Sequence, residues 1–140
     1  ENAEFYHKAS AMIHKSIRED VDFNVYQWAV TADDTIKSDT YFLKEDDSFL
    51  VHGIEQGLHG HRGPNGARGN AKGFRSIGRK VNIGHSHSAG IIDGVYVAGV
   101  SGLLDMDYNK GPSSWSHSHI LTYTNGKRTI ITMKNGKWRA

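Results

Sequence analysis

Two Asn-Gly dipeptides near the end of the chain constrain its fold more than any other feature. They lie at 125–126 and 135–136 within HILTYTNGKRTIITMKNGKW (119–138), each between two runs rich in β-branched residues. Both residues of an Asn-Gly pair tolerate a positive φ, which the tight turns of β-hairpins require. The chain is therefore predicted to end in an antiparallel meander of three to four strands.

The beginning of the chain predicts helix. Residues 3–18 (AEFYHKASAMIHKSIR) repeat apolar side chains at helical spacing, which indicates an amphipathic helix. The short run 25–30 (VYQWAV) is compatible with either a helix or a strand. A further short helix is expected within GARGNAKGFRSI (66–77).

Strand patterns recur between these helices and the final meander. One strand is predicted at 48–54 (SFLVHGI). Another is predicted at 81–85 (VNIGH), where the strand leads into a loop. Within 90–100, Asp93-Gly94 marks a turn between two β-branched runs. The 140 residues are enough for one domain with a modest core, so a single mixed α/β domain is expected.

Composition excludes several classes of protein. Because there are no cysteines, disulfides, thiolate zinc sites and a cysteine nucleophile are ruled out. This fits a reducing compartment, and a cytoplasmic protein is expected. No run approaches the ~18–20 apolar residues of a membrane span and no signal segment opens the chain, so no membrane partner is expected. The start at Glu1, without an initiator Met, favours a processed or truncated product.

The region 53–90 holds more than half of the sixteen glycines, and within it 62–80 carries six basic residues and no acidic one. Glycine is usually retained where the backbone turns with positive φ or passes close to something. A basic stretch of this kind suits an anionic ligand such as phosphate, although such stretches are often only solvated surface. The net charge of +2 by itself favours no partner.

Six of the nine histidines form three His-x-His pairs, at 59/61, 85/87 and 117/119. A splayed pair between glycine and serine, as in GHSH (84–87), can give one imidazole to each of two metal ions about 3.5–4 Å apart. The pair 59/61 is a weaker metal signal, because only its glycine neighbour favours open access. The pair 117/119 precedes a strong strand pattern, whose alternation puts Trp115, His117 and His119 on one face of a half-exposed strand.

Carboxylates are scarce beside these histidines. Asp93, Asp105 and Asp107 are the only acidic residues after position 55. Asp93 is predicted to lie in a turn. The segment LLDMDY (103–108) could offer a pair of metal ligands, but its pattern favours a surface strand. Two ions need roughly eight ligands, including a bridging carboxylate, so these residues alone do not predict a complete two-metal site.

HGHRGPNGARG (59–69), IGHSH (83–87), GPSSWSHSH (111–119) and YTNGKRTIITMKNGKWR (123–139) together resemble the C-terminal portion of calcineurin-like metallophosphoesterases of the compact phage and bacterial type. That family orders its metal motifs as D-x-H, G-D, G-N-H-D/E, H-G and G-H-x-H, and the last two occur here. The resemblance covers most of the chain but only the latter half of a typical catalytic domain. It implies an α/β fold (α+β as a fragment): the C-terminal half of a four-layer β-sandwich with flanking helices, with residues 1–140 as one part of a single catalytic domain.

The resemblance also implies a metal centre. His59 and His85 would ligate one divalent ion and His87 the other, with Mn²⁺ the leading candidate and Zn²⁺, Fe or Ni²⁺ as alternatives. The remaining ligands and the catalytic histidine lie upstream in the family, and have no counterpart here. They would have to come from the N-terminal half of the domain, in the same or another chain.

The expected substrate is a phosphate ester. His61 stands where the family often has Asp, and is expected behind the metal ligands or facing the substrate. Arg62 and Arg68 lie in the glycine-rich loop, where they could bind phosphate or a nucleic-acid backbone bidentately, although solvated loop arginines are equally expected.

Three functions follow from these patterns. The leading one is hydrolysis of phosphate mono- or diesters by a two-metal-activated hydroxide, acting on DNA or nucleotides, in the host cytoplasm if the protein is phage-encoded. The second is a catalytically incomplete nucleic-acid-binding or assembly module of the same fold. The third is a mononuclear histidine-rich hydrolase that uses Asp105 or Asp107.

Overall fold

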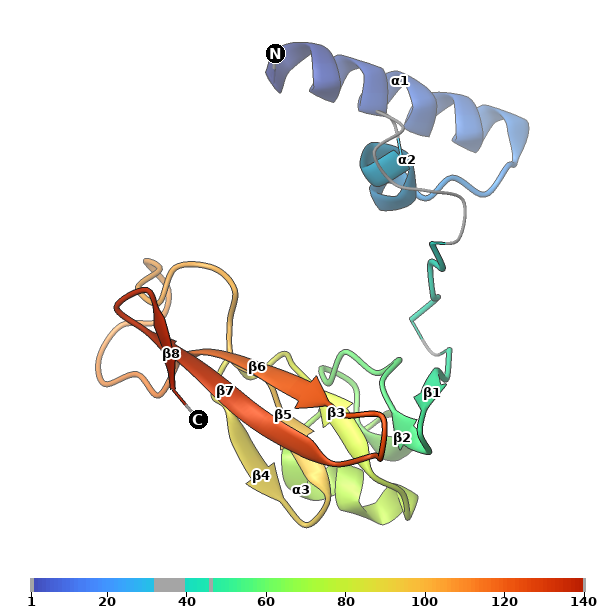
Figure 1. The fold of residues 1–140 in the computed structure, drawn as a ribbon. Helices are drawn as coiled ribbons and strands as arrows, with labels where there is room; N and C mark the ends of the chain where they lie inside the picture. Colours follow the sequence, from blue (N-terminus) through green and yellow to red (C-terminus); the bar gives the residue numbers. More distant parts are fainter. Residues whose placement is uncertain (1, 32–39, 46, 140) are drawn as a thin grey trace. The chain divides into compact units, whose positions relative to one another are not determined.

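A computed structural model of the protein describes residues 2–31, 40–45 and 47–139 (Figure 1). The chain divides into two compact units, Glu1–Phe42 and Leu43–Ala140. The described residues form a mixed α/β structure, as the sequence predicts at the level of fold class. None of the helices in these ranges combines the length and apolar character needed to cross a membrane.

The first unit is helical. Helix α1 (Asn2–Glu19) confirms the prediction for 3–18, and α2 (Val25–Thr31) settles 25–30 as helix. The side chain of Asn24 accepts a hydrogen bond from the backbone N–H of Gln27, which caps α2. Phe5 of α1 stacks on Trp28 of α2 with 5.5 Å between ring centroids, so aromatic packing joins the two helices.

The second unit begins with a five-stranded sheet in the order β1-β2-β3-β5-β4. Strand β3 pairs in parallel with both β2 and β5, while β1 and β4 pair antiparallel at the two edges. The strands are β1 (Leu50–Val51), β2 (Ile54–Glu55), β3 (Val81–Ile83), β4 (Gly90–Ile92) and β5 (Val95–Val97). Strand β3 and the Asp93-Gly94 turn confirm two sequence predictions.

The prediction of one strand over 48–54 is wrong. The segment forms two short antiparallel strands, β1 and β2, because the chain reverses at His52-Gly53, where both residues have positive φ (51° and 73°). A histidine is an uncommon residue at the first position of such a turn, so the pattern looked continuous.

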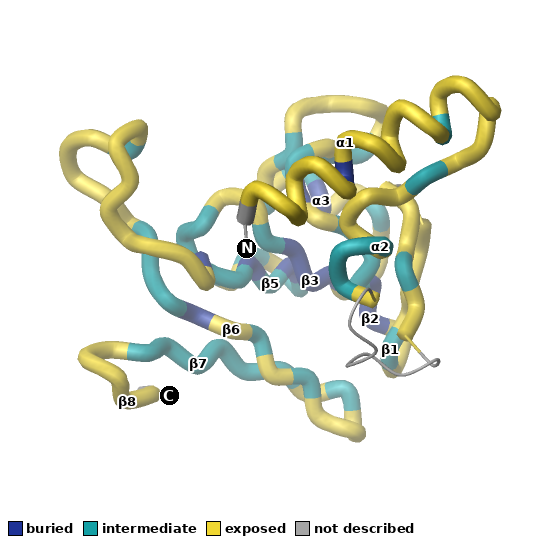
Figure 2. The backbone as a smooth tube through the Cα atoms, turned by 90° about the horizontal axis from the view of Figure 1, so that it is seen from above, coloured by how far each residue is buried: buried dark blue, intermediate teal, exposed yellow. Residues whose placement is uncertain are grey.

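One face of the first sheet packs on a short helical segment made of α3 (Ala71–Phe74) and a 3₁₀ turn (Arg75–Ile77), which confirms the helix expected within 66–77. The buried residues of this unit are concentrated in β2, β3 and β5 (Figure 2). The apolar core of this unit lies between the sheet and the helical segment and consists of Phe74, Val81, Ile83, Val95 and Val97.

The chain ends in an antiparallel three-stranded sheet in the order β6-β7-β8, as the two Asn-Gly turns predict. Its strands are β6 (His117–Thr122), β7 (Arg128–Lys134) and β8 (Lys137–Arg139). In the second turn Asn135 and Gly136 both have positive φ, at 52° and 72°. Ser118 is 1% exposed while its neighbour His119 is exposed, so β6 alternates between an inner and an outer face as expected.

The two sheets meet through polar groups. Arg128 of β7 donates hydrogen bonds from Nη1 to the carbonyl of Val81 (2.8 Å) and to Oδ1 of Asn82 (2.7 Å). Its Nη2 donates to the carbonyl of Gly94 (2.8 Å), and its guanidinium lies 3.9 Å from the ring centroid of Tyr96. These contacts fix β7 against β3 and the β4–β5 hairpin.

A buried carboxylate organises the segment before β1. Glu55 is 3% exposed, and its carboxylate accepts hydrogen bonds from the backbone N–H of Phe49 and Gly57 (2.9 Å each) and from the Ser48 hydroxyl (2.5 Å). Burial raises the pKa of Glu55, but these hydrogen bonds outweigh it and hold the pKa below its usual value.

We predict that Glu55→Gln lowers the free energy of unfolding by about 2 kcal/mol at pH 7, because an amide cannot accept all the bonds that the carboxylate accepts. A carboxylate with a lowered pKa adds stability above its unfolded-state pKa and loses it as the pH falls through the folded-state value. The difference between variant and wild type should therefore shrink below about pH 4. Urea unfolding at several pH values measures this; a pH-independent difference would contradict it.

Candidate functional site

Three of the predicted histidines gather at one end of the first sheet. His59 follows β2 and His85 follows β3. Because these strands run parallel, both loops begin at the carboxyl ends of their strands, on the same side of the sheet. The backbone N–H of Gly84 donates to the carbonyl of His59 (2.9 Å), which fastens the two loops together. In open α/β sheets the crevice beyond the carboxyl ends of parallel strands is the usual place for a ligand.

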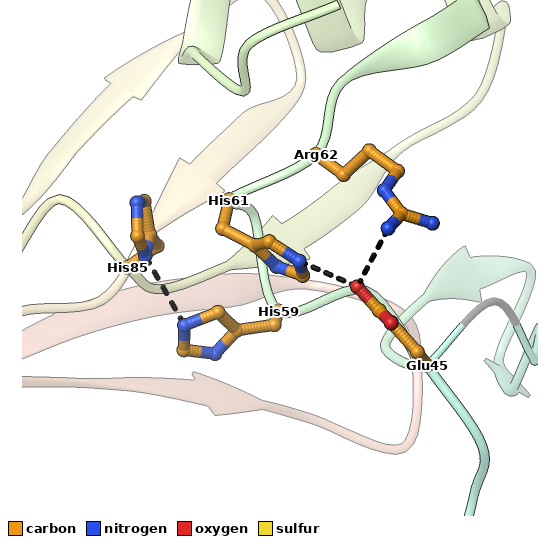
Figure 3. Close-up of polar contacts among 5 residues, drawn as sticks. All are labelled: Glu45, His59, His61, Arg62 and His85. Atoms are coloured by element: carbon orange, nitrogen blue, oxygen red, sulfur yellow. Dashed lines mark hydrogen bonds and ion pairs between the residues drawn. The ribbon is translucent and has the colours of Figure 1, made fainter. Parts of the chain in front are cut away.

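The imidazoles of His59, His61 and His85 lie close together (Figure 3). His85 Nδ1 is 3.2 Å from His59 Nε2, within hydrogen-bond distance. The ring centroids are 5.1 Å apart for His59 and His85, 5.4 Å for His59 and His61, and 5.8 Å for His61 and His85. His61 and His85 are 24 residues apart in sequence, so two separate motifs contribute to this group. We call His59, His61 and His85 the histidine cluster.

The GHSH segment has an unusual backbone. His85 and His87 both have positive φ, 64° and 61°. This region disfavours a residue with a Cβ by roughly 1–2 kcal/mol, and such strain is found most often at functional sites. The strain turns the two imidazoles away from the positions that a flat strand would give them.

His87 does not share in the close ring contacts of the cluster. Its ring packs edge-on against Trp115, with 4.3 Å between centroids, and Ser116 N–H donates to the His87 carbonyl (3.3 Å). Its Nδ1 is buried without a hydrogen-bond partner among the described residues, and the same holds for Nδ1 of His61. Buried unpaired nitrogens are costly, so each is a candidate ligand atom.

Glu45 joins the cluster, although the sequence gave no reason to select it. Its Oε1 lies 2.6 Å from His61 Nε2 and 3.3 Å from Arg62 Nη2 (Figure 3). It belongs to an acidic run, KEDD, fourteen residues before His59, without a motif or periodicity that links it to the histidines. Arg62, predicted to contact phosphate, is half exposed beside this carboxylate.

The loop between His61 and Gly69 folds back on itself. Gly63 N–H donates to the Ala67 carbonyl (2.7 Å) and Gly69 N–H donates to the His61 carbonyl (2.8 Å). A Cβ on Gly69 would lie 1.8 Å from the carbonyl oxygen of Gly60, so only glycine allows this approach. The loop returns Arg68 opposite Arg62, with which it forms an isolated β-bridge, and the charge of Arg68 contributes to the lowered pKa of His85.

The pair 117/119 lies in β6, as predicted. His117 Nε2 is bonded to the carbonyl of Gly102 (2.7 Å). The surface strand expected at 103–108 is wrong: Asp105 and Asp107 lie in an irregular loop, which the Asn109 side chain closes through bonds to Met106 N–H (2.7 Å) and the Leu104 carbonyl (2.8 Å).

The cluster contains metal-binding residue types but not a closed ligand set. Within 2–31, 40–45 and 47–139, no three His, Asp or Glu side chains are arranged to hold a metal ion. Neutral imidazole is the form that binds metal, and the environment favours that form at His85. Desolvation lowers the pKa of His85, as do the nearby His59, His61, His87 and Arg68.

Comparison with known proteins identifies a phage relative. The chain is 51% identical to Protein A1 of Escherichia phage T5 over 140 residues. This alignment covers 99% of the chain but 25% of Protein A1, so the chain spans about a quarter of the length of that relative. No protein-family model matches the chain. No solved structure matches it.

We predict that His85→Gly unfolds with a free energy about 1 kcal/mol higher than His85→Ala, because glycine adopts positive φ without the Cβ penalty. Ser86 lies between the two strained residues and does not have positive φ, so Ser86→Gly should not be more stable than Ser86→Ala. Urea unfolding of the four variants measures the two differences. Equal stability of the two His85 variants would contradict a left-handed backbone there.

We also predict that His85 titrates below the usual value of about 6.5 in metal-free protein, and that Arg68→Gln raises its pKa. A histidine with a lowered pKa resists protonation in the folded state, so its contribution favours folding above the unfolded-state pKa and weakens as the pH falls through that value. NMR titration of the imidazole in EDTA measures the pKa. Arg75→Gln is the control, because Arg75 pairs with Asp93 (2.8 Å).

Proposed function

We propose that this chain is part of a metal-dependent phosphoesterase that hydrolyses phosphate mono- or diesters, with DNA or nucleotides as the substrate class. In this proposal the two sheets are the C-terminal half of a four-layer metallophosphoesterase sandwich. The observation that carries the proposal is the meeting of His59, His61 and His85 at the carboxyl ends of β2 and β3. Two motifs separate in sequence form one cluster there, and the resemblance assigns metal ligands to both.

The donor atoms suit divalent ions such as Mn²⁺, Zn²⁺, Fe or Ni²⁺. His59 and His85 would hold one ion and His87 the other, and the unpaired Nδ1 of His87 is consistent with a ligand role. When bound, two such ions polarise phosphoryl oxygens and lower the pKa of a water that attacks phosphorus. The missing carboxylate ligands would come from another segment of the same or another chain.

The protein's own residues would position the phosphate. Arg68 lies opposite Arg62 in an isolated β-bridge of the 61–69 loop, and its guanidinium could donate two hydrogen bonds to phosphate. Glu45 competes with phosphate for Arg62 and His61, because its carboxylate already lies within 3.3 Å of both. Phosphate binding at Arg62 would therefore require Glu45 to move away or to turn to a metal ion.

A catalytically incomplete nucleic-acid-binding or assembly module is the second candidate. It is favoured by one observation: among the described residues, the histidines do not close into a metal-binding group. The basic residues of 62–80 would serve such a module equally well. The likeness to a phage protein supports a place in the host cytoplasm for either function.

We predict that the chain binds Mn²⁺ weakly and that His59→Ala or His85→Ala weakens this binding by at least about tenfold, because loss of even an outer-shell partner costs about 10–100-fold. His14→Ala is the control, since His14 is exposed in α1 of the helical unit. Isothermal titration measures the affinity, and bis-p-nitrophenyl phosphate with Mn²⁺ reports hydrolysis, expected to be slow without the missing ligands.

Mn²⁺ affinity unchanged in both cluster variants would contradict the metal site. Rapid turnover by these 140 residues alone would contradict the need for further carboxylates. Salt-dependent DNA binding that survives both variants, without Mn²⁺ binding or hydrolysis, would establish the second candidate instead.

A further inference from the structure

The loop 101–116 presents large apolar side chains to solvent in a fixed shape. Leu103 is 72% exposed and Tyr108 69% exposed. The Asn109 side chain closes the turn at Met106, and the loop is tied down at both ends. At one end His117 bonds the Gly102 carbonyl, and at the other the hydroxyls of Ser114 and Ser88 are 2.7 Å apart. A fixed loop with exposed apolar side chains has the features of a binding surface.

Two aromatic rings of this loop, Tyr108 and Trp115, form a chain of ring contacts that ends at the predicted metal ligand His87. Tyr108 contacts Trp115 edge to face, with 5.6 Å between centroids, and Trp115 contacts His87 at 4.3 Å. Trp115 is half buried and Tyr108 largely exposed, so the rings lead from the site outward. The carbonyl of His87 also accepts a hydrogen bond from Ser116 N–H, which holds the loop to the GHSH segment.

We propose that Tyr108 and Trp115 form a stacking site for a base of an unpaired nucleotide, adjacent to His87. This inference builds on the proposed function by naming a single-stranded or frayed nucleic acid as the substrate class. Aromatic side chains beside a cationic groove are how proteins bind single strands without reading sequence, since every base has a π-face. A paired, stacked base in a duplex does not offer that face.

The rings adjoin the GHSH segment, because Trp115 contacts His87. Under the proposed function a phosphate is held next to these histidines, so a nucleic acid fits the rings better than an apolar peptide does. Asp105 and Asp107 belong to the loop itself and would repel phosphate there. The loop therefore contributes to binding through the base, and the sugar–phosphate chain would run toward the histidine cluster.

The test is binding of a fluorescent ten-nucleotide oligodeoxythymidine in EDTA, measured by anisotropy. Stacking of one base on an aromatic ring accounts for about tenfold in affinity or more, so Tyr108→Leu should weaken binding about tenfold. Tyr108→Phe retains the ring and should bind as wild type does. Tyr123→Leu is the matched control, because Tyr123 is a half-exposed tyrosine (47%) outside the loop 101–116.

An abasic oligonucleotide of the same length should bind weakly, and Tyr108→Leu should not weaken it further. The proposal is overturned if Tyr108→Leu binds oligodeoxythymidine as wild type does, or if it weakens the abasic strand equally. Because this assay needs neither metal nor turnover, base-dependent binding together with a Mn²⁺ affinity that is unchanged in His59→Ala and His85→Ala would reject the phosphoesterase alone. Hydrolysis of bis-p-nitrophenyl phosphate with no effect of Tyr108→Leu on oligonucleotide binding would reject the stacking site alone.

Discussion

Arg128 reaches from β7 into the first sheet and donates hydrogen bonds to three of its oxygen atoms, while Tyr96 covers its guanidinium. Partial burial of this cation is costly, and burial lowers its pKa. A planar fork of donors can reach Val81, Asn82 and Gly94 together, whereas the single ammonium of a lysine cannot. This side chain holds β7 in position on the first sheet, while Asn82 holds β6 through a hydrogen bond to Thr122.

That position in turn determines the surroundings of the histidine cluster. The backbone of Gly99 and Val100 bonds Ser118 and Ser116 at the start of β6 (2.8 and 2.9 Å). The loop 101–116 connects these two segments. It lies beside the GHSH segment, because Ser114 bonds Ser88 and the Ser116 N–H donates to the His87 carbonyl. The apolar core lies on the other face of the first sheet, against α3, which leaves the face toward β6 and β7 for polar groups.

The sequence predicted those parts of the fold in which local chemistry decides the structure. The Asn135-Gly136 and Asp93-Gly94 turns, the amphipathic pattern of α1 and the alternation of β6 appear as expected, and the hairpin at Asn125-Gly126 forms with positive φ at the glycine alone. The strand at 48–54 failed because His52 adopts a turn conformation that sequence patterns assign to glycine or asparagine. The residues alone predict the histidine cluster only as two motifs, since nothing local shows that His59 and His85 meet; the family resemblance is what placed them together, as ligands of one ion. Glu45 could not be found, because a tertiary contact alone makes it a partner of His61.

The left-handed backbone of His85 and His87 links ligand binding to folding. In an unfolded chain these residues leave that region of φ/ψ space, so the two imidazoles have no fixed relation to each other. A ligand held by both would bind the folded protein alone and would raise its melting temperature in proportion to the logarithm of its concentration, once it exceeds Kd. Because the strained backbone is already present in the folded chain without a ligand, the rest of the fold offsets its cost, and a ligand would meet a site that is organised before binding.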